Sequence, residues 1–156
     1  MISATHLHAM LIHFPIALLT VAFLFEVISA IFKREFYKKV SLLLLILGTI
    51  GVIAAFLSGG SAGEGIEEGP LKIPMELHEQ AANFAIWIAC ITATFHTTIY
   101  FLNYKSVVTK AIGMLLFAFL IAAVSRTAYL GGQLVYSHGA GVELALPDFE
   151  NASENN

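Results

Sequence analysis

Histidine is the residue type of this chain with the clearest chemical potential, because its imidazole ligates metals and exchanges protons near neutral pH. The sequence contains 6 histidines. Relative to the apolar stretches of the chain, most of them fall toward one end: His6, His8, His13, His78 and His138. His96 alone falls toward the other end. Several imidazoles gathered at one end of a small apolar bundle favour a haem or metal site there.

Arg126 is a second residue of interest, because it lies inside the apolar stretch 111–130. A guanidinium within the bilayer is costly and should face a partner or water. We expect it to point into the half of the bundle that carries most histidines. One interpretation is an anchor for an anionic group, such as a haem propionate, a quinone oxygen or a phosphate. The other is an ion pair with Glu64, Glu76 or Glu79.

Glu26 and His96 are a third feature, because both are ionisable residues within apolar stretches. Glu26 precedes Lys33 by 7 residues and His96 precedes Lys105 by 9. At about 1.5 Å of helical rise per residue, both lie roughly 10–14 Å from the same edge. We predict a hydrogen-bonded contact that lowers the cost of burying either group. This contact would join two helices or form half of a proton path.

The composition identifies the class of protein that must position these residues. Hydrophobic residues make up 58% of the chain and charged residues 12%, and the mean hydropathy is +0.80. Such values are typical of an integral membrane protein. Apolar stretches at 10–32, 40–57, 81–102 and 111–130 approach the roughly 20 residues that a spanning helix needs.

The basic residues predict the orientation of these spans. The two short connections between spans one and two and between spans three and four carry Lys33, Arg34, Lys38, Lys39, Lys105 and Lys110. By the positive-inside rule both connections are cytoplasmic, so both termini and 58–80 lie outside a bacterial plasma membrane. No Lys or Arg precedes the first apolar stretch, and we therefore expect it to be retained rather than cleaved as a signal.

The predicted fold is an all-α, four-helix up-and-down membrane bundle with both termini outside. The transmembrane domain covers 1–146, and 147–156 forms a polar acidic tail. Pro70 and Pro74 should interrupt helix formation in the long connection, which could then act as a lid over the outer end. We expect an extension of the fourth helix to reach His138 and to end at Gly139. Cys90 is the single cysteine, so no intrachain disulfide is possible.

The two halves of the chain share a pattern. Each half has a histidine before an inward helix, a basic connection, and a return helix that ends near a glycine pair, Gly59-Gly60 or Gly131-Gly132. This pattern raises the hypothesis of an internal duplication of a helical hairpin.

Several motifs together resemble a known family. They are 8–19 (HAMLIHFPIALL), Ser58-Gly59, His78 and 132–142 (GQLVYSHGAGV). The chain resembles the predicted membrane proteins catalogued as domain of unknown function 2231, over almost its whole length up to the acidic tail. The resemblance maps the histidines of the family onto His8, His13, His78 and His138. Members commonly open with His-Pro, whereas this chain has His8-Ala9. Related proteins occur beside or fused to cytochrome c-like domains, which implies electron transfer.

We therefore favour a cytochrome-like membrane protein that holds haem b near its outer face through two histidines. It would pass electrons between a membrane donor and an outer partner such as a cytochrome c-like protein. His13 and His78 are the first candidates for the axial ligands, with His8 and His138 as a second pair or the true pair. Arg126 would meet a propionate.

Two alternatives use the same chain differently. In the first, His8, His13, His78 and His138 hold a zinc, copper or iron ion together with a carboxylate such as Glu64 or Glu76. In the second, the protein is a cofactor-free subunit or adaptor of a respiratory assembly, with copies of itself or other subunits as partners. No pattern indicates nucleic-acid binding, a catalytic serine or cysteine, or a phosphate loop, and whether the protein is an enzyme is not decided.

Overall fold

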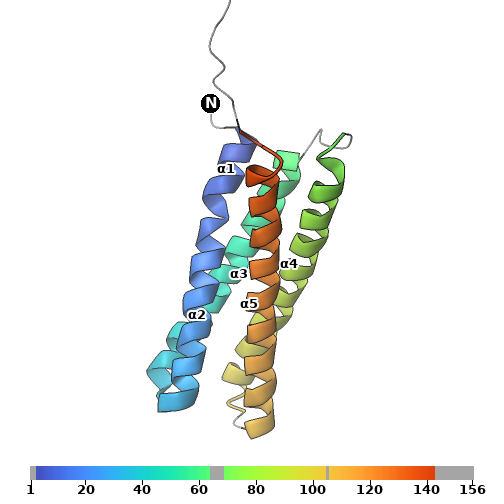
Figure 1. The fold of residues 1–156 in the computed structure, drawn as a ribbon. Helices are drawn as coiled ribbons and strands as arrows, with labels where there is room; N and C mark the ends of the chain where they lie inside the picture. Colours follow the sequence, from blue (N-terminus) through green and yellow to red (C-terminus); the bar gives the residue numbers. More distant parts are fainter. Residues whose placement is uncertain (1–2, 64–68, 105, 143–156) are drawn as a thin grey trace, which may run out of the picture.

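The computed structural model describes residues 3–63, 69–104 and 106–142 and folds them into helices (Figure 1). These are α1 (Ala4–Leu11), α2 (His13–Phe32), α3 (Glu35–Gly63), α4 (Lys72–Phe101) and α5 (Val107–Tyr136). No strand occurs in the described part. The all-α prediction is therefore confirmed for these residues.

Helices α1 and α2 continue one another and form a single membrane-length segment, Ala4–Phe32. Their junction is Ile12, whose backbone keeps helical angles and whose N–H still bonds to the carbonyl of His8 at 3.1 Å. Pro15 has no N–H to offer to the carbonyl of Leu11, which explains why the helix is interrupted at this turn. The interruption is local, and the chain continues in the same direction (Figure 1).

The structure has 4 helices that are long and apolar enough to span a membrane: Ala4–Phe32, Glu35–Gly63, Lys72–Phe101 and Val107–Tyr136. Each contains one of the predicted apolar stretches, so the four-span prediction is confirmed. The helices extend beyond the predicted spans mainly at the histidine end. In α3, for example, the helix continues through glycines and small polar residues to Gly63.

The expected lid is smaller than predicted, because most of the connection 58–80 is helical. Pro74 does not interrupt α4, since it lies in the first turn, where a missing N–H costs no intrahelical bond. Residues 64–68, including Glu64, lie outside the described residues. At the other end of the chain Gly139, with φ +67, follows α5 and donates its N–H to the carbonyl of Val135. The fourth helix ends at Tyr136, so the predicted extension stops before His138, while Gly139 adopts the left-handed conformation expected of a C-terminal glycine.

The helices form two antiparallel hairpins that pack side by side (Figure 1). The first hairpin is α1, α2 and α3, and the second is α4 and α5. Contacts between hairpins run from α3 to α4 and from α2 to α5. In the described residues α2 and α4 make no close backbone contact, which places them diagonally across the bundle. The up-and-down topology is confirmed.

Buried positions recur in the two hairpins with a constant register. Along α2 and α4, buried residues differ in number by 70: Pro15, Leu19 and Ala22 correspond to Ala85, Ala89 and Thr92. Along α3 and α5, they differ by 72: Ser41, Leu45 and Gly48 correspond to Gly113, Phe117 and Leu120. The same rotational setting in both hairpins supports the duplication hypothesis and gives the bundle an approximate twofold symmetry about its long axis.

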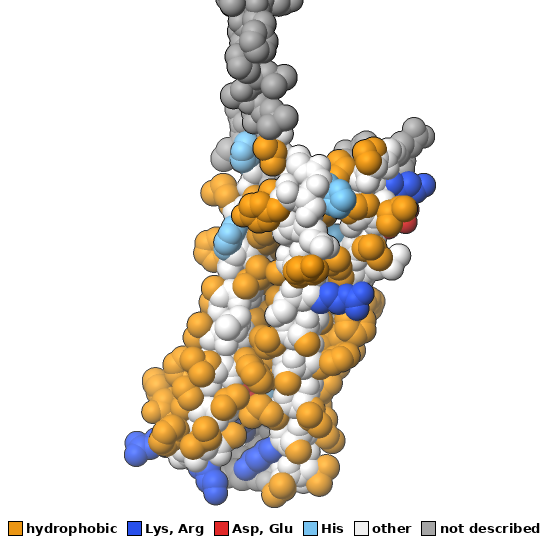
Figure 2. Space-filling view, viewed as in Figure 1, with side chains coloured by type: hydrophobic (Ala, Val, Ile, Leu, Met, Phe, Trp, Pro, Cys, Tyr) orange, Lys and Arg blue, Asp and Glu red, His pale blue; other side chains and the backbone are white. Residues whose placement is uncertain are grey.

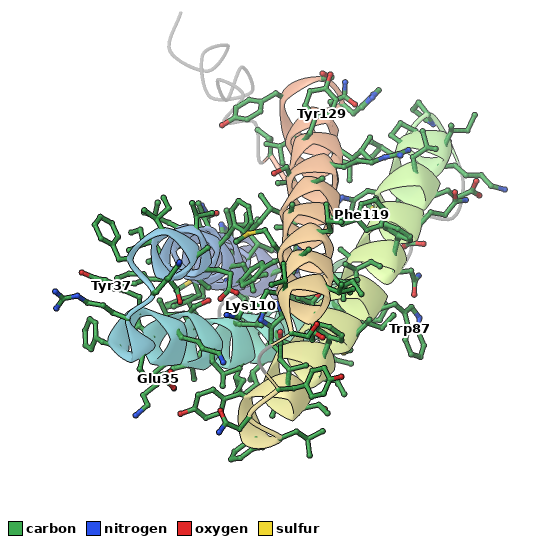
Figure 3. All side chains as sticks on the ribbon, turned by 90° about the horizontal axis from the view of Figure 1, so that it is seen from below. Glu35, Tyr37, Trp87, Lys110, Phe119 and Tyr129 are labelled. Atoms are coloured by element: carbon green, nitrogen blue, oxygen red, sulfur yellow. The ribbon has the colours of Figure 1, made fainter. Side chains whose placement is uncertain are left out.

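The core is narrow and the exterior is apolar. Leu19, Leu45, Phe117 and Leu120 are fully buried at the centre. Large side chains such as Trp87 and Tyr129 are 68% and 66% exposed and point away from the bundle (Figure 3). Figure 2 shows hydrophobic side chains covering the visible face along most of its length. An apolar exterior of this kind requires lipid around it.

Candidate imidazole site and the inner polar pair

His8 lies on α1 and turns toward α3. Its Nδ1 is 2.9 Å from the hydroxyl oxygen of Ser58. That hydroxyl donates its single hydrogen to the carbonyl of Ala55 at 2.9 Å, so it accepts from the imidazole. Nδ1 of His8 therefore carries the proton, and Nε2 keeps its lone pair.

His78 lies on α4 and makes the corresponding contact with α5. Its Nδ1 is 3.2 Å from the carbonyl oxygen of Thr127. A carbonyl can only accept, so Nδ1 is the donor and Nε2 again keeps a lone pair. A bond from one ring nitrogen to a fixed acceptor is the usual way of orienting a metal-ligating histidine.

A glycine on the neighbouring helix makes room for each ring. A Cβ built on Gly59 would lie 3.1 Å from Cε1 of His8, and one built on Gly131 would lie 3.1 Å from Cε1 of His78. The next glycines, Gly60 and Gly132, have nothing within 4 Å of that position. Each imidazole therefore lies directly against the backbone of its neighbouring helix.

The two imidazoles are related by the approximate symmetry of the bundle. His8 and His78 differ in number by 70, and Gly59 and Gly131 by 72, as do the buried positions below them. Both rings are partly buried, and they lie close enough for a charge on one to be felt by the other. The structure thus brings together two oriented imidazoles from diagonally opposed helices.

The other three histidines at this end, His6, His13 and His138, are exposed and do not share the surroundings of His8 and His78. Nδ1 of His13, at the start of α2, bonds to the carbonyl of Ala9 in α1 at 2.7 Å, and Nδ1 of His6 lies 2.9 Å from the hydroxyl of Ser3. His138 follows α5 and is exposed. His8 and His78 are the two histidines whose rings pack against a glycine of the neighbouring helix. The sequence analysis had instead named His13 and His78 as the first candidates for the axial ligands.

The described part of the chain contains no metal site built from three or more protein ligands. Among these residues no group of three or more His, Cys, Asp or Glu side chains could hold a metal ion. His8, His13, His78 and His138 therefore do not converge on one ion, although the helices place them at the same end of the bundle, where Figure 2 shows pale-blue histidine side chains.

Arg126 lies on the exposed side of α5, not in the interior between the hairpins. With Leu77, Gln80, Ala81 and Phe84 it lines a shallow hollow of about 150 Å³ on the outside of α4 and α5. No ion pair to Arg126 is formed within the described ranges. Arg126 does lie in the half of the bundle that carries most histidines, as expected, but its side chain does not share the surroundings of His8 and His78.

Glu26 and His96 meet across the diagonal of the bundle near the opposite end. Oε1 of Glu26 is 4.0 Å from Nδ1 of His96, an ion-pair distance longer than the predicted hydrogen bond. Nε2 of His96 is 3.1 Å from the carbonyl of Gly113. Oε2 of Glu26 is 3.0 Å from the hydroxyl of Ser41. The two residues occupy equivalent positions in the two hairpins.

Ser41 is a contact that the sequence analysis missed. The basic residues continue to Lys39, only 2 residues before Ser41, and conceal the match; with α2 ending at Phe32 and α3 beginning at Glu35, Glu26 and Ser41 each lie 6 residues from the turn. In an antiparallel hairpin two such residues lie at the same depth. The contact of His78 with Thr127 could not be predicted in this way, because it uses the backbone carbonyl, which every residue has.

Fold and site together define a four-helix membrane protein, built from two similar hairpins, with an imidazole pair near one end and a Glu–His pair near the other. The chain belongs to the family described as predicted membrane protein (DUF2231), whose family model matches residues 4–144. The resemblance drawn from the motifs is therefore confirmed. No curated protein and no solved structure matches the chain.

Proposed function

We propose that this protein is an electron-transfer protein of the bacterial plasma membrane that holds haem b between His8 and His78. The observation that carries the proposal is the pair of oriented imidazoles on diagonal helices, each with Nδ1 engaged and Nε2 free. A porphyrin supplies four of the six ligands of its iron, so two protein imidazoles complete the set. A structural zinc site needs about four protein ligands, and the described residues offer no such group.

The residues around the pair fit a bound haem. The hydroxyl of Ser58 and the carbonyl of Thr127 fix the ring tautomers, as outer-shell partners of ligating histidines do. Gly59 and Gly131 let each ring approach the helix behind it. When bound, haem b supplies a one-electron redox couple. The chain itself would orient the two ligands and exclude water with its apolar walls, and no enzymatic step is part of the proposal.

The orientation in the membrane follows from charge. Lys33, Arg34, Lys38, Lys39 and Lys110 lie at the end opposite the imidazole pair, whereas Lys72 and Arg126 lie toward it. By the positive-inside rule the more basic end would lie in the cytoplasm, so the imidazole pair and both described chain ends would face outward. The electron partner at that face would be a cytochrome c-like or other soluble redox protein, and the donor would come from the membrane.

The first experiment is purification in mild detergent from haem-replete cells, followed by oxidised and dithionite-reduced absorption spectra and a pyridine haemochrome assay. We expect stoichiometric haem b and a sharp reduced α-band. His8→Ala and His78→Ala should each lose the band, because either change removes an axial ligand. His13→Ala is the matched control, since His13 lies at the same end but outside the pair, and it should keep its haem.

A colourless wild-type preparation would overturn the haem proposal. Elemental analysis of the same sample would then separate a bound zinc, copper or iron ion from a cofactor-free adaptor. If haem were present but lost in His13→Ala and retained in His8→Ala, the assignment of the ligands would be wrong.

A further inference from the structure

Glu26 and His96 belong to a chain of contacts that joins four groups from four helices. Glu26 comes from α2, Ser41 from α3, His96 from α4 and the carbonyl of Gly113 from α5. His96 is 7% exposed and Ser41 is 1% exposed. Burying ionisable side chains inside a membrane bundle is energetically costly. Where such residues occur, they often belong to ion pathways or proton relays.

The hydroxyl of Ser41 can satisfy either protonation state of Glu26. Its oxygen is 3.0 Å from Oε2 of Glu26 and 3.0 Å from the carbonyl oxygen of Ala22. When Glu26 is a carboxylate, the single hydroxyl hydrogen can point to Oε2. When Glu26 is a carboxylic acid protonated on Oε1, Oε2 still accepts from the hydroxyl; with the proton on Oε2, the hydroxyl can turn to Ala22 and accept from Glu26 instead. No backbone movement is needed for the change.

The imidazole of His96 has one nitrogen committed and one available. Nε2 must carry a hydrogen, because its partner at 3.1 Å is the carbonyl of Gly113. Nδ1 faces Oε1 of Glu26 at 4.0 Å. A bare Nδ1 lone pair opposite a carboxylate is unfavourable, so a proton on either Nδ1 or Oε1 stabilises the pair. One proton therefore has two adjacent sites.

Among the described residues, the groups that contact this pair from α3 and α5 carry no charge. From α3 it meets Ser41, and from α5 it meets the Gly113 carbonyl and the ring of Phe117, whose centroid is 5.5 Å from that of His96. Lys38 turns to the ring of Tyr100, and Lys39 lines an outer hollow. Lys110 lies one turn nearer the basic end, at the start of α5 (Figure 3).

We propose that Glu26 and His96 form a reversible proton-binding site in the half of the membrane nearest the basic loops. The side chain of Glu26 is 19% exposed and that of His96 8%, so the carboxyl is the more accessible member. A proton from water at the basic end binds at Oε1 of Glu26 or Nδ1 of His96, and the pair goes from net charge −1 to neutral. The site is separate from the imidazole pair and does not depend on haem.

The test is ¹⁵N NMR of the full chain labelled with ¹⁵N-histidine in detergent, with His96→Gln used to assign the signals. Spectra recorded between about pH 5 and about pH 8 should show Nε2 of His96 protonated throughout. The signal of Nδ1 should report uptake of a proton as the pH falls. In Glu26→Gln this uptake should be lost, because an imidazolium there would lack its carboxylate.

Glu35→Gln is the matched control, since Glu35 lies exposed at the start of α3 and should leave the His96 signals unchanged. If the Nδ1 signal of His96 does not move across the range in wild type, neither the imidazole nor the carboxyl that faces it takes up a proton, so the proton-site proposal fails and the pair only joins helices. The same failure follows if Glu26→Gln titrates as wild type does. Either result leaves the haem assay unaffected.

Discussion

Two glycines decide how close the imidazoles of His8 and His78 lie to the helices behind them. The ring of His78 cannot simply move away from Gly131, because its Nδ1 is bonded to Thr127 on the same helix. A Cβ on Gly131 would lie 3.1 Å from Cε1 and 3.4 Å from Nδ1 of that ring. Gly131 therefore has to lack a side chain so that the ring of His78 can keep its position.

The replacement Gly131→Ala should displace His78 and destabilise the protein by about 1–3 kcal/mol, as overpacking typically does. Thermal or denaturant unfolding in detergent would measure this loss. Gly132→Ala is the matched control, because nothing lies within 4 Å of its Cβ position. It should be neutral or stabilise the helix by up to about 1 kcal/mol. Equal effects of the two replacements would contradict a specific packing contact between the ring of His78 and Gly131.

At the scale of the elements, the two hairpins fill the centre of the bundle with pairs of residues that differ by only one methyl group in total but place the large residue on opposite helices. The first hairpin pairs a large Leu19 with Gly48, and a Cβ on Gly48 would lie 2.6 Å from Cδ2 of Leu19. The equivalent positions of the second hairpin carry a small Ala89 and a large Leu120. All of these residues except Gly48 belong to one buried cluster.

This exchange predicts the outcome of a double-mutant cycle. Leu19→Ala alone should leave a cavity and cost about 2–5 kcal/mol, and Gly48→Leu alone should clash with Leu19. Together they reproduce the arrangement of the second hairpin, so the double variant should lie within about 1.5 kcal/mol of wild type, as volume-conserving swaps do. Unfolding free energies of the four proteins give the coupling. Additive losses would argue against equivalent hairpins.

The elements also show where sequence patterns suffice. Length and hydropathy located all four spans, because crossing a bilayer core needs a long apolar run. The ends were less predictable. Gly59 and Gly60 suggested that α3 ends near them, yet α3 continues to Gly63, and Pro74 was read as a breaker although it lies in a first helical turn.

At the scale of the whole molecule, the two ends of the bundle differ in charge and in histidine content. Both described chain ends lie at the histidine end, since α1 starts there and α5 finishes there (Figure 1). The positive-inside rule then predicts one orientation for the entire bundle.

Cysteine labelling in intact cells and in inverted vesicles would test this orientation. In a Cys90→Ala background, Ser3→Cys and Ser137→Cys should react with an impermeant reagent from outside. Arg34→Cys, in the connection between α2 and α3, should react only in inverted vesicles. All three positions are exposed, so access depends on the side of the membrane. Labelling of Arg34→Cys in intact cells would reverse the assignment.

The sequence alone determined the four spans and the depth of the chemical groups, because depth along a helix follows from about 1.5 Å of rise per residue. On that basis His8, His13, His78 and His138 fell at one end, and Glu26 and His96 shared a level. The tertiary structure decided which side chains face one another, because that depends on how each helix is rotated against its neighbours. Packing against Gly59 and Gly131 turns His8 and His78 inward, while His13 and Arg126 face outward.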